Sequence, residues 1–254
     1  MKHSLTSILL ISITAYVGLG VYIYLIQRDY IYFPVGPVSH IYEEQVFKND
    51  NESIRVTVLN RKNRDAIIYF GGNAEAVDFN ASKFSSLFQN HAVFLVKYRG
   101  YGGSTGKPEE AALYSDALHI FDRIKPEYTN ISIIGRSLGS GVATLVASKR
   151  KIHKLVLITP FDSLYGIAQK AFPIYPTALL LKEKYDSYSR ASTITADTLI
   201  ISAEFDHIVD KEHTNRLVGQ FPPSQVNHEI IRDRGHNTIS DNEKYYSLLK
   251  DFFK

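Results

Sequence analysis

Short apolar runs alternate along the chain with longer stretches in which apolar residues recur every three or four positions. The runs predict strands at 54–59, 66–70, 92–98, 131–134, 155–159, 198–202 and 226–231. Helical spacing lies between them at 77–89, 109–124, 138–149, 211–221 and 242–253. Several strands are apolar on both faces and are followed by a helix, a pattern typical of α/β proteins. We therefore expect a mostly parallel sheet with helices on both faces.

The first apolar stretch is longer than any of these runs. No residue from Leu5 to Ile26 is charged, and about 22 residues at about 1.5 Å each span about 33 Å, enough to cross a bilayer core. Residues 1–27 therefore predict a single-pass membrane anchor, followed by one domain over residues 28–254. A cleaved signal peptide is less favoured, because the small residues Gly18 and Gly20 lie inside the run. The charge of Lys2 slightly favours a domain outside the cytoplasm.

One interval between strands is too long for a bare crossover helix. Residues 162–196 are rich in apolar side chains, and we interpret them as a short lid or cap insertion over the carboxyl ends of the strands. The candidate substrate-binding residues there are Phe161, Leu164, Tyr165 and Phe172. A helix pair packed on the sheet without ligand contact is an equally open interpretation for each of them.

Composition removes several classes of function. The net charge of the 254 residues is +3, and the basic residues are scattered, so nucleic-acid binding is not expected. The absence of cysteine excludes disulfides, thiol catalysis and cysteine-based metal sites. No metal is expected, because His207 and His213 fit the solvated start of a helix better than a ligand pair. The sequence carries no signal for an oligomeric state.

The strongest chemical motif is Gly-Arg-Ser-Leu-Gly at 135–139, between a predicted buried strand and a predicted helix. A G-x-S-x-G sequence in this context is typical of a nucleophile elbow, which makes Ser137 the candidate nucleophile. Asp206 and His236 follow later strands, so all three side chains are expected at the carboxyl edge of the sheet. We assign His236 as the base and Asp206 as the acid that orients it; Asp162 is a fallback acid.

A catalytic serine also needs donors for the developing oxyanion. The predicted strand 66–70 ends in Gly-Gly-Asn-Ala-Glu, and we expect the backbone amides of Asn73 and Leu138 to form the oxyanion hole. A second glycine-rich segment, 102–107, looks like the end of a phosphate-binding loop. It lacks the required first glycine, and Pro108 replaces the Ser or Thr that would bind magnesium, so we reject that interpretation.

Together these motifs resemble those of the α/β-hydrolase superfamily, and within it the bud-emergence-protein-like, membrane-anchored serine hydrolases. The resemblance covers nearly all of the chain after the anchor. It rests on Tyr-Phe-Pro at 32–34, Gly-Gly-Asn-Ala at 71–74, Tyr-Arg-Gly-Tyr-Gly at 98–102 with Ser104 and Gly106, the elbow at 135–139, Tyr-Asp-Ser at 185–187, Asp-His-Ile-Val at 206–209 and Gly-His-Asn at 235–237. This chain has Gly71 where the family usually has histidine, and Asp210 where it often has proline.

The resemblance implies an α/β-hydrolase fold with an eight-stranded sheet. It also implies a cofactor-free serine hydrolase of ester or thioester bonds (EC 3.1), with esterase, thioesterase and lysophospholipase activity as the variants. The substrate that it implies is an acyl ester or lipid, which suits a membrane anchor. A serine peptidase of the same fold is one alternative. An inactive hydrolase fold, used as a membrane-tethered interaction domain, is another, but the presence of Ser137, Asp206 and His236 argues against it.

Overall fold

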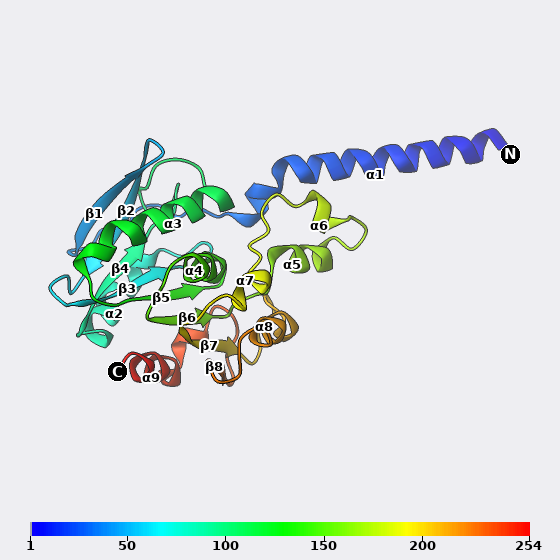
Figure 1. Ribbon diagram of the computed structural model, residues 1–254. Coiled ribbons are helices and arrows are strands. Elements are labelled where there is room, and N and C mark those ends of the chain that lie inside the picture. The colour runs from blue at the N-terminus through cyan, green and yellow to red at the C-terminus, as the bar shows by residue number, and fades with distance from the viewer. Residues whose placement is uncertain (1) are drawn as a thin grey trace.

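A computed structural model describes residues 2–254, and its centre is one eight-stranded sheet (Figure 1). The strands lie in the order β1-β2-β4-β3-β5-β6-β7-β8. The pairs β1–β2 and β2–β4 are antiparallel, and the other neighbours are parallel, so the mostly parallel sheet is confirmed. The strands are β1 Glu43–Asn49, β2 Glu52–Leu59, β3 Asp65–Phe70, β4 His91–Val96, β5 Ile131–Arg136, β6 Lys154–Ile158, β7 Asp197–Ala203 and β8 Val226–Ile231.

Helices cover both faces of the sheet. They are α1 Lys2–Ile31, α2 Ala81–Leu87, α3 Glu110–Ile124, α4 Leu138–Lys149, α5 Leu164–Ala171, α6 Thr177–Leu180, α7 Tyr188–Ala191, α8 Lys211–Val218 and α9 Glu243–Phe252. Successive β3 residues enter different cores: Ile68 packs with residues of α3 and α4, and Ile67 packs with residues of α2 and α9. This alternation explains why the central strands are apolar throughout. The predicted helix 77–89 divides into a 3-10 turn, Val77–Asn80, and α2.

The predicted lid interval contains three short helices, α5, α6 and α7, rather than a sheet-packed crossover helix. Figure 1 shows α5 and α6 beside α1, which extends away from the sheet. The segment Leu5–Ile31 is long and apolar enough to cross a membrane, and its apolar window is not buried in the fold. The helix is continuous to Ile31, so the anchor and the domain are joined without a break in secondary structure.

Candidate active site

Ser137 lies at the turn between β5 and α4, at the carboxyl edge of the sheet. Its backbone has φ 49° and ψ −115°, a positive-φ conformation that costs a non-glycine residue about 1–3 kcal/mol. Its amide donates a hydrogen bond to the carbonyl oxygen of Ile158 on β6 at 2.8 Å. Strand, strained turn and helix therefore follow one another as the nucleophile-elbow pattern requires.

The structure brings Ser137, His236 and Asp206 together. The Nε2 atom of His236 lies 2.8 Å from Ser137 Oγ, and its Nδ1 atom lies 2.8 Å from Asp206 Oδ2. The other oxygen of Asp206 accepts hydrogen bonds from the backbone amides of Ile208 and Val209, which fix the carboxylate. With a proton on Nδ1, the imidazole donates to Asp206 and can accept the hydroxyl proton of Ser137 at Nε2.

The fallback acid Asp162 lies in a different network. Its carboxylate is 2.6 Å from His213 Nδ1 and 2.7 Å from Arg216 Nε, both on α8. Burial would raise the pKa of Asp162, but the hydrogen bonds from His213 and Arg216 hold it below its ordinary value. Asp162 therefore fastens the start of the lid to α8, while Asp206 faces His236.

The glycine-rich loop after β3 lies against the nucleophile. A Cβ atom added to Gly72 would be 3.6 Å from the Cβ atom of Ser137. The Gly72 amide donates to Glu75 Oε2 at 2.6 Å and is therefore occupied. The amides of Asn73, next in this loop, and of Leu138, the first residue of α4, stay predictions as the oxyanion donors.

The side chain of Asn73 joins this loop to the end of α1. Its Nδ2 atom donates to the carbonyl oxygen of Ile31 at 2.6 Å. Its Oδ1 atom accepts from the Phe33 amide at 3.0 Å and from the Tyr101 hydroxyl at 2.8 Å. The last residue of α1 thus contacts a residue expected to bind the oxyanion, a link that no local sequence pattern indicates.

We compared the chain with known proteins. No protein-family model matches. An uncharacterised protein of Mycobacterium tuberculosis is 29% identical over 245 residues, covering 89% of this chain and 87% of the relative. The protein bem46 of Schizosaccharomyces pombe is 25% identical, covering 93% and 88%. The α/β-hydrolase domain-containing protein aho-3 of Caenorhabditis elegans is 28% identical, covering 78% and 64%.

The chain is therefore similar over most of its length to bem46 and to proteins named as α/β-hydrolase domain-containing. Among solved structures, the Pyrococcus furiosus esterase Pf2001 superposes with a TM-score of 0.67 at 16% identity, covering 87% of this chain and 98% of the esterase. A hydrolase from Pseudomonas aeruginosa superposes with a TM-score of 0.66 at 15% identity, covering 83% and 98%. These likenesses confirm the α/β-hydrolase fold. The similarity to α/β-hydrolase domain-containing proteins supports hydrolase activity in general.

The side chains around position 71 crowd the place where the resembled family usually has a histidine. A Cβ atom on Gly71 would lie 2.5 Å from Val77 Cγ1 and 3.3 Å from Glu75 Oε2. Glu75 supports the loop by accepting from the Gly72 amide and, at 2.7 Å, from the Tyr69 hydroxyl. Burial and the neighbouring Glu75 carboxylate raise the pKa of Tyr69, so its hydroxyl keeps the proton that it donates. The sequence pattern did not indicate this supporting role, although Glu75 is the last residue of the Gly-Gly-Asn-Ala-Glu run.

The cleft that contains Ser137 has a volume of about 650 Å³ and is closed on one side by the segment after α1. Residues Val35–Val38 of that segment line the cleft. No pattern in the sequence predicts that this segment forms part of the site. The segment is fastened at its start, where Phe33 meets Asn73, and at its end, where the ring of His40 reaches a buried polar cluster. The segment between α1 and β1 is thus a fixed wall of the cleft.

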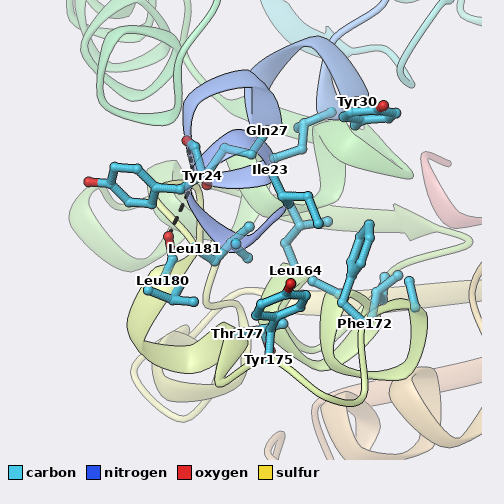
Figure 2. A pocket seen from close by; sticks show the side chains of 15 residues that line it. Ile23, Tyr24, Gln27, Tyr30, Leu164, Phe172, Tyr175, Thr177, Leu180 and Leu181 are labelled. Atoms are coloured by element: carbon cyan, nitrogen blue, oxygen red, sulfur yellow. Dashed lines mark hydrogen bonds between the residues drawn. The ribbon is translucent and has the colours of Figure 1, made fainter. Parts of the chain in front are cut away.

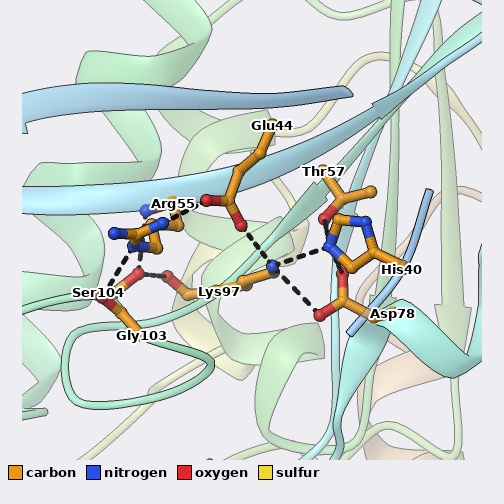
Figure 3. Close-up of polar contacts among 8 residues, drawn as sticks. All are labelled: His40, Glu44, Arg55, Thr57, Asp78, Lys97, Gly103 and Ser104. Atoms are coloured by element: carbon orange, nitrogen blue, oxygen red, sulfur yellow. Dashed lines mark hydrogen bonds and ion pairs between the residues drawn. The ribbon is translucent and has the colours of Figure 1, made fainter. Parts of the chain in front are cut away.

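Lys97 is the centre of that polar cluster (Figure 3). Its ammonium group lies 3.0 Å from Asp78 and 2.7 Å from Glu44, and 3.4 Å from Nε2 of His40. Burial would raise the pKa of Glu44, but the hydrogen bonds from Lys97 and Arg55 hold it below its ordinary value. The paired charges tie this segment, β1 and the 3-10 turn to the carboxyl end of β4.

The four candidate substrate-binding residues do not line the cleft that contains Ser137. Phe161 is buried in the core, and Tyr165 is 41% exposed. Leu164 and Phe172 instead line a second cavity of about 190 Å³ between the lid and α1 (Figure 2). Ile31, at the end of α1, links the two sites: it lines the apolar cavity, and its carbonyl oxygen accepts a hydrogen bond from Asn73, which lines the cleft.

Proposed function

We propose that this chain is a serine hydrolase that cleaves carboxylic ester or thioester bonds of substrates with acyl chains. The observation that carries the proposal is the continuous hydrogen-bonded series from Ser137 through His236 to Asp206. His236 accepts the hydroxyl proton as Ser137 Oγ adds to the substrate carbonyl carbon, and then gives it to the departing alcohol or thiol. A water molecule, deprotonated by His236, next attacks the acyl-enzyme and releases the carboxylic acid.

The preference for acyl chains is supported by the surroundings of the site. The second cavity is lined almost entirely by apolar side chains, and one of its lining residues, Ile31, is hydrogen-bonded to Asn73 in the wall of the cleft that contains Ser137. One of its walls is the helix that is apolar enough to span a membrane. We propose that the domain lies at a membrane surface, where substrates with acyl chains are concentrated, and the charge of Lys2 favours the side away from the cytoplasm.

A fluorophosphonate probe and a series of p-nitrophenyl esters test the function. The full-length chain in detergent should be labelled by the probe, which reacts with activated serines. Turnover of the esters should rise with acyl length from acetyl towards octanoyl, because a longer chain buries more apolar surface. Labelling without any ester turnover, or turnover of the acetyl ester alone, would contradict the acyl-chain proposal.

Replacing Asn73 with alanine should lower kcat while changing KM much less. The variant keeps the backbone amide but loses the side-chain contacts with Ile31, Phe33 and Tyr101 that hold it. Loss of one oxyanion donor lowers kcat by about 10²–10³-fold in other enzymes, so misplacing one should cost about 10–100-fold. Steady-state kinetics with a p-nitrophenyl ester measures both parameters.

Asn63→Ala is the matched control, because Asn63 also donates to backbone carbonyl oxygens but lies in a surface turn away from the cleft. It should leave kcat unchanged. Equal kcat values for Asn73→Ala and the unmodified chain would show that the loop keeps its geometry without the contacts to α1.

A further inference from the structure

The lid contains an uncharged segment that is exposed to solvent. Residues 171–181 read Ala-Phe-Pro-Ile-Tyr-Pro-Thr-Ala-Leu-Leu-Leu, with Lys170 before them and Lys182 after them. Ile174 is 66% exposed and Leu179 is 81% exposed, so the segment does not bury these side chains against the domain. Contiguous exposed apolar side chains bordered by charge mark a surface that is covered by something other than water.

This lid segment is fastened to α1 along the part of the helix that is suited to a membrane. The rings of Tyr16 and Tyr175 stack with their centroids 4.7 Å apart. The Tyr16 hydroxyl donates to the Ile174 carbonyl oxygen at 2.8 Å, and the Tyr175 hydroxyl donates to the Tyr16 carbonyl oxygen at 2.9 Å. Gly20 makes room, since a Cβ atom there would lie 2.9 Å from the Tyr175 ring. The tip of the lid thus lies beside the middle of the apolar stretch Leu5–Ile31.

Polar side chains of the lid and of α1 begin at the same level. The Lys182 ammonium group lies 4.2 Å from the centre of the Tyr24 ring. The Gln27 side chain donates to the Leu180 carbonyl oxygen and accepts from the Lys182 amide. Arg28 then pairs with Glu183 at 2.6 Å. Both elements therefore change from apolar to charged side by side, as expected where a membrane surface meets water.

The distance along the helix places the lid tip inside the apolar layer. Tyr16 precedes Tyr24 by eight residues, which at about 1.5 Å per residue is about 12 Å along the axis. A bilayer that covers α1 up to Tyr24 would therefore also surround Ile174. The cavity of about 190 Å³ lies between the same two elements, with Ile23 from α1 and Leu164 and Phe172 from the lid in its walls (Figure 2).

We propose that the lid segment 171–181 inserts into the hydrocarbon of the leaflet that α1 enters from the domain side, so that the cavity between lid and helix opens to lipid acyl chains. At one border of the segment the Lys182 ammonium group, over the Tyr24 ring, marks the headgroup level. At the other border Lys170 pairs with Asp210 of the domain, and the apolar side chains between the two lysines lie deeper. This inference concerns a surface of the protein and does not depend on whether the site hydrolyses any substrate.

Single tryptophans test the insertion, because the chain contains none. The full-length variants Ile174→Trp and Leu179→Trp are reconstituted in phosphatidylcholine vesicles with or without brominated acyl chains, which quench nearby indole fluorescence. Val46→Trp on β1 is the matched control: Val46 is apolar, 50% exposed and on a strand far from α1 (Figure 1). Leu10→Trp within α1 reports a position surrounded by lipid.

We expect several-fold stronger quenching by brominated lipid at positions 174 and 179 than at position 46, and similar to that at position 10. Quenching by iodide in the aqueous phase should show the reverse order. If the two lid positions match Val46→Trp in both measurements, the lid lies outside the membrane and the proposal is wrong. Lack of lipid quenching at Leu10→Trp would overturn it equally, because the insertion requires α1 in the bilayer. Two lid variants with exposed side chains guard against an effect of one substitution on folding.

Discussion

Replacing Ser137 with alanine should abolish fluorophosphonate labelling and lower kcat for acyl esters by about 10⁴-fold or more. The change removes the oxygen that attacks the substrate, and nothing else within 2.8 Å of His236 Nε2 supplies a nucleophile in the described part of the chain. The fold should persist, because the alanine keeps the Cβ atom and the backbone hydrogen bond to Ile158. Ester turnover and melting temperature, measured on the same preparation, separate the two effects.

A second serine–histidine pair offers a matched control. Ser202 Oγ on β7 lies 2.8 Å from His228 Nε2 on β8, the same separation as in the candidate site. Burial lowers the pKa of His228, so this imidazole is held neutral, but the pair lies along two strands rather than at the cleft. Ser202→Ala should therefore leave labelling and turnover unchanged. If Ser137→Ala hydrolysed esters nearly as fast as Ser202→Ala, Ser137 would not be the nucleophile.

His236→Ala provides a further check on the assignment. Residues of a triad act as one unit, so the double variant with Ser137→Ala should be no less active than either single variant. Additive losses would indicate that the two side chains act in separate steps.

The sequence was sufficient for the features that follow from local patterns. Buried parallel strands have continuous apolar runs, so the apolar runs predict most strands correctly. Because parallel strands end at the same edge of a sheet, their order along the chain is enough to bring Ser137, Asp206 and His236 to that edge. Strand β1 was not predicted, because the prediction of strands relied on continuous apolar runs. Its residues Glu43–Asn49 form an exposed edge of the sheet and contain no apolar run.

Contacts between distant segments could not be predicted in this way. Tyr16 and Tyr175 are 159 residues apart in the sequence, yet their rings stack and the Tyr175 hydroxyl donates to the Tyr16 carbonyl oxygen. Neither segment carries a motif that would predict this contact. The clamp from Asn73 to Ile31 likewise depends on where α1 ends. The helix α1 continues past the apolar run because two of its polar residues are bound by the lid: Gln27 accepts a hydrogen bond from the Lys182 amide, and Arg28 pairs with Glu183. Side chains that look like a polar boundary in sequence are thus part of a tertiary contact.

Gly139→Ala should prevent the elbow from forming in its present geometry. A Cβ atom at position 139 would lie 2.1 Å from the Phe70 carbonyl oxygen and 2.6 Å from that of Gly71. Both are backbone atoms, at the end of β3 and the start of the glycine-rich loop, so no side-chain rotation relieves the overlap. Overpacking a core costs about 1–3 kcal/mol when side chains can adjust, and we expect at least about 3 kcal/mol here.

The control is Gly219→Ala at the end of α8, where an added Cβ atom would lie 3.6 Å from its nearest neighbours, the carbonyl oxygens of Arg216 and Asn215. Denaturant midpoints of the two variants should differ clearly, with Gly219→Ala close to the unmodified chain. The overlap in Gly139→Ala pushes on the loop that carries Asn73, so any folded fraction should also lose turnover. A Gly139→Ala variant as stable and as active as Gly219→Ala would mean that α4 can move away from β3 without disturbing Ser137, and the close approach would then have no role in positioning the nucleophile.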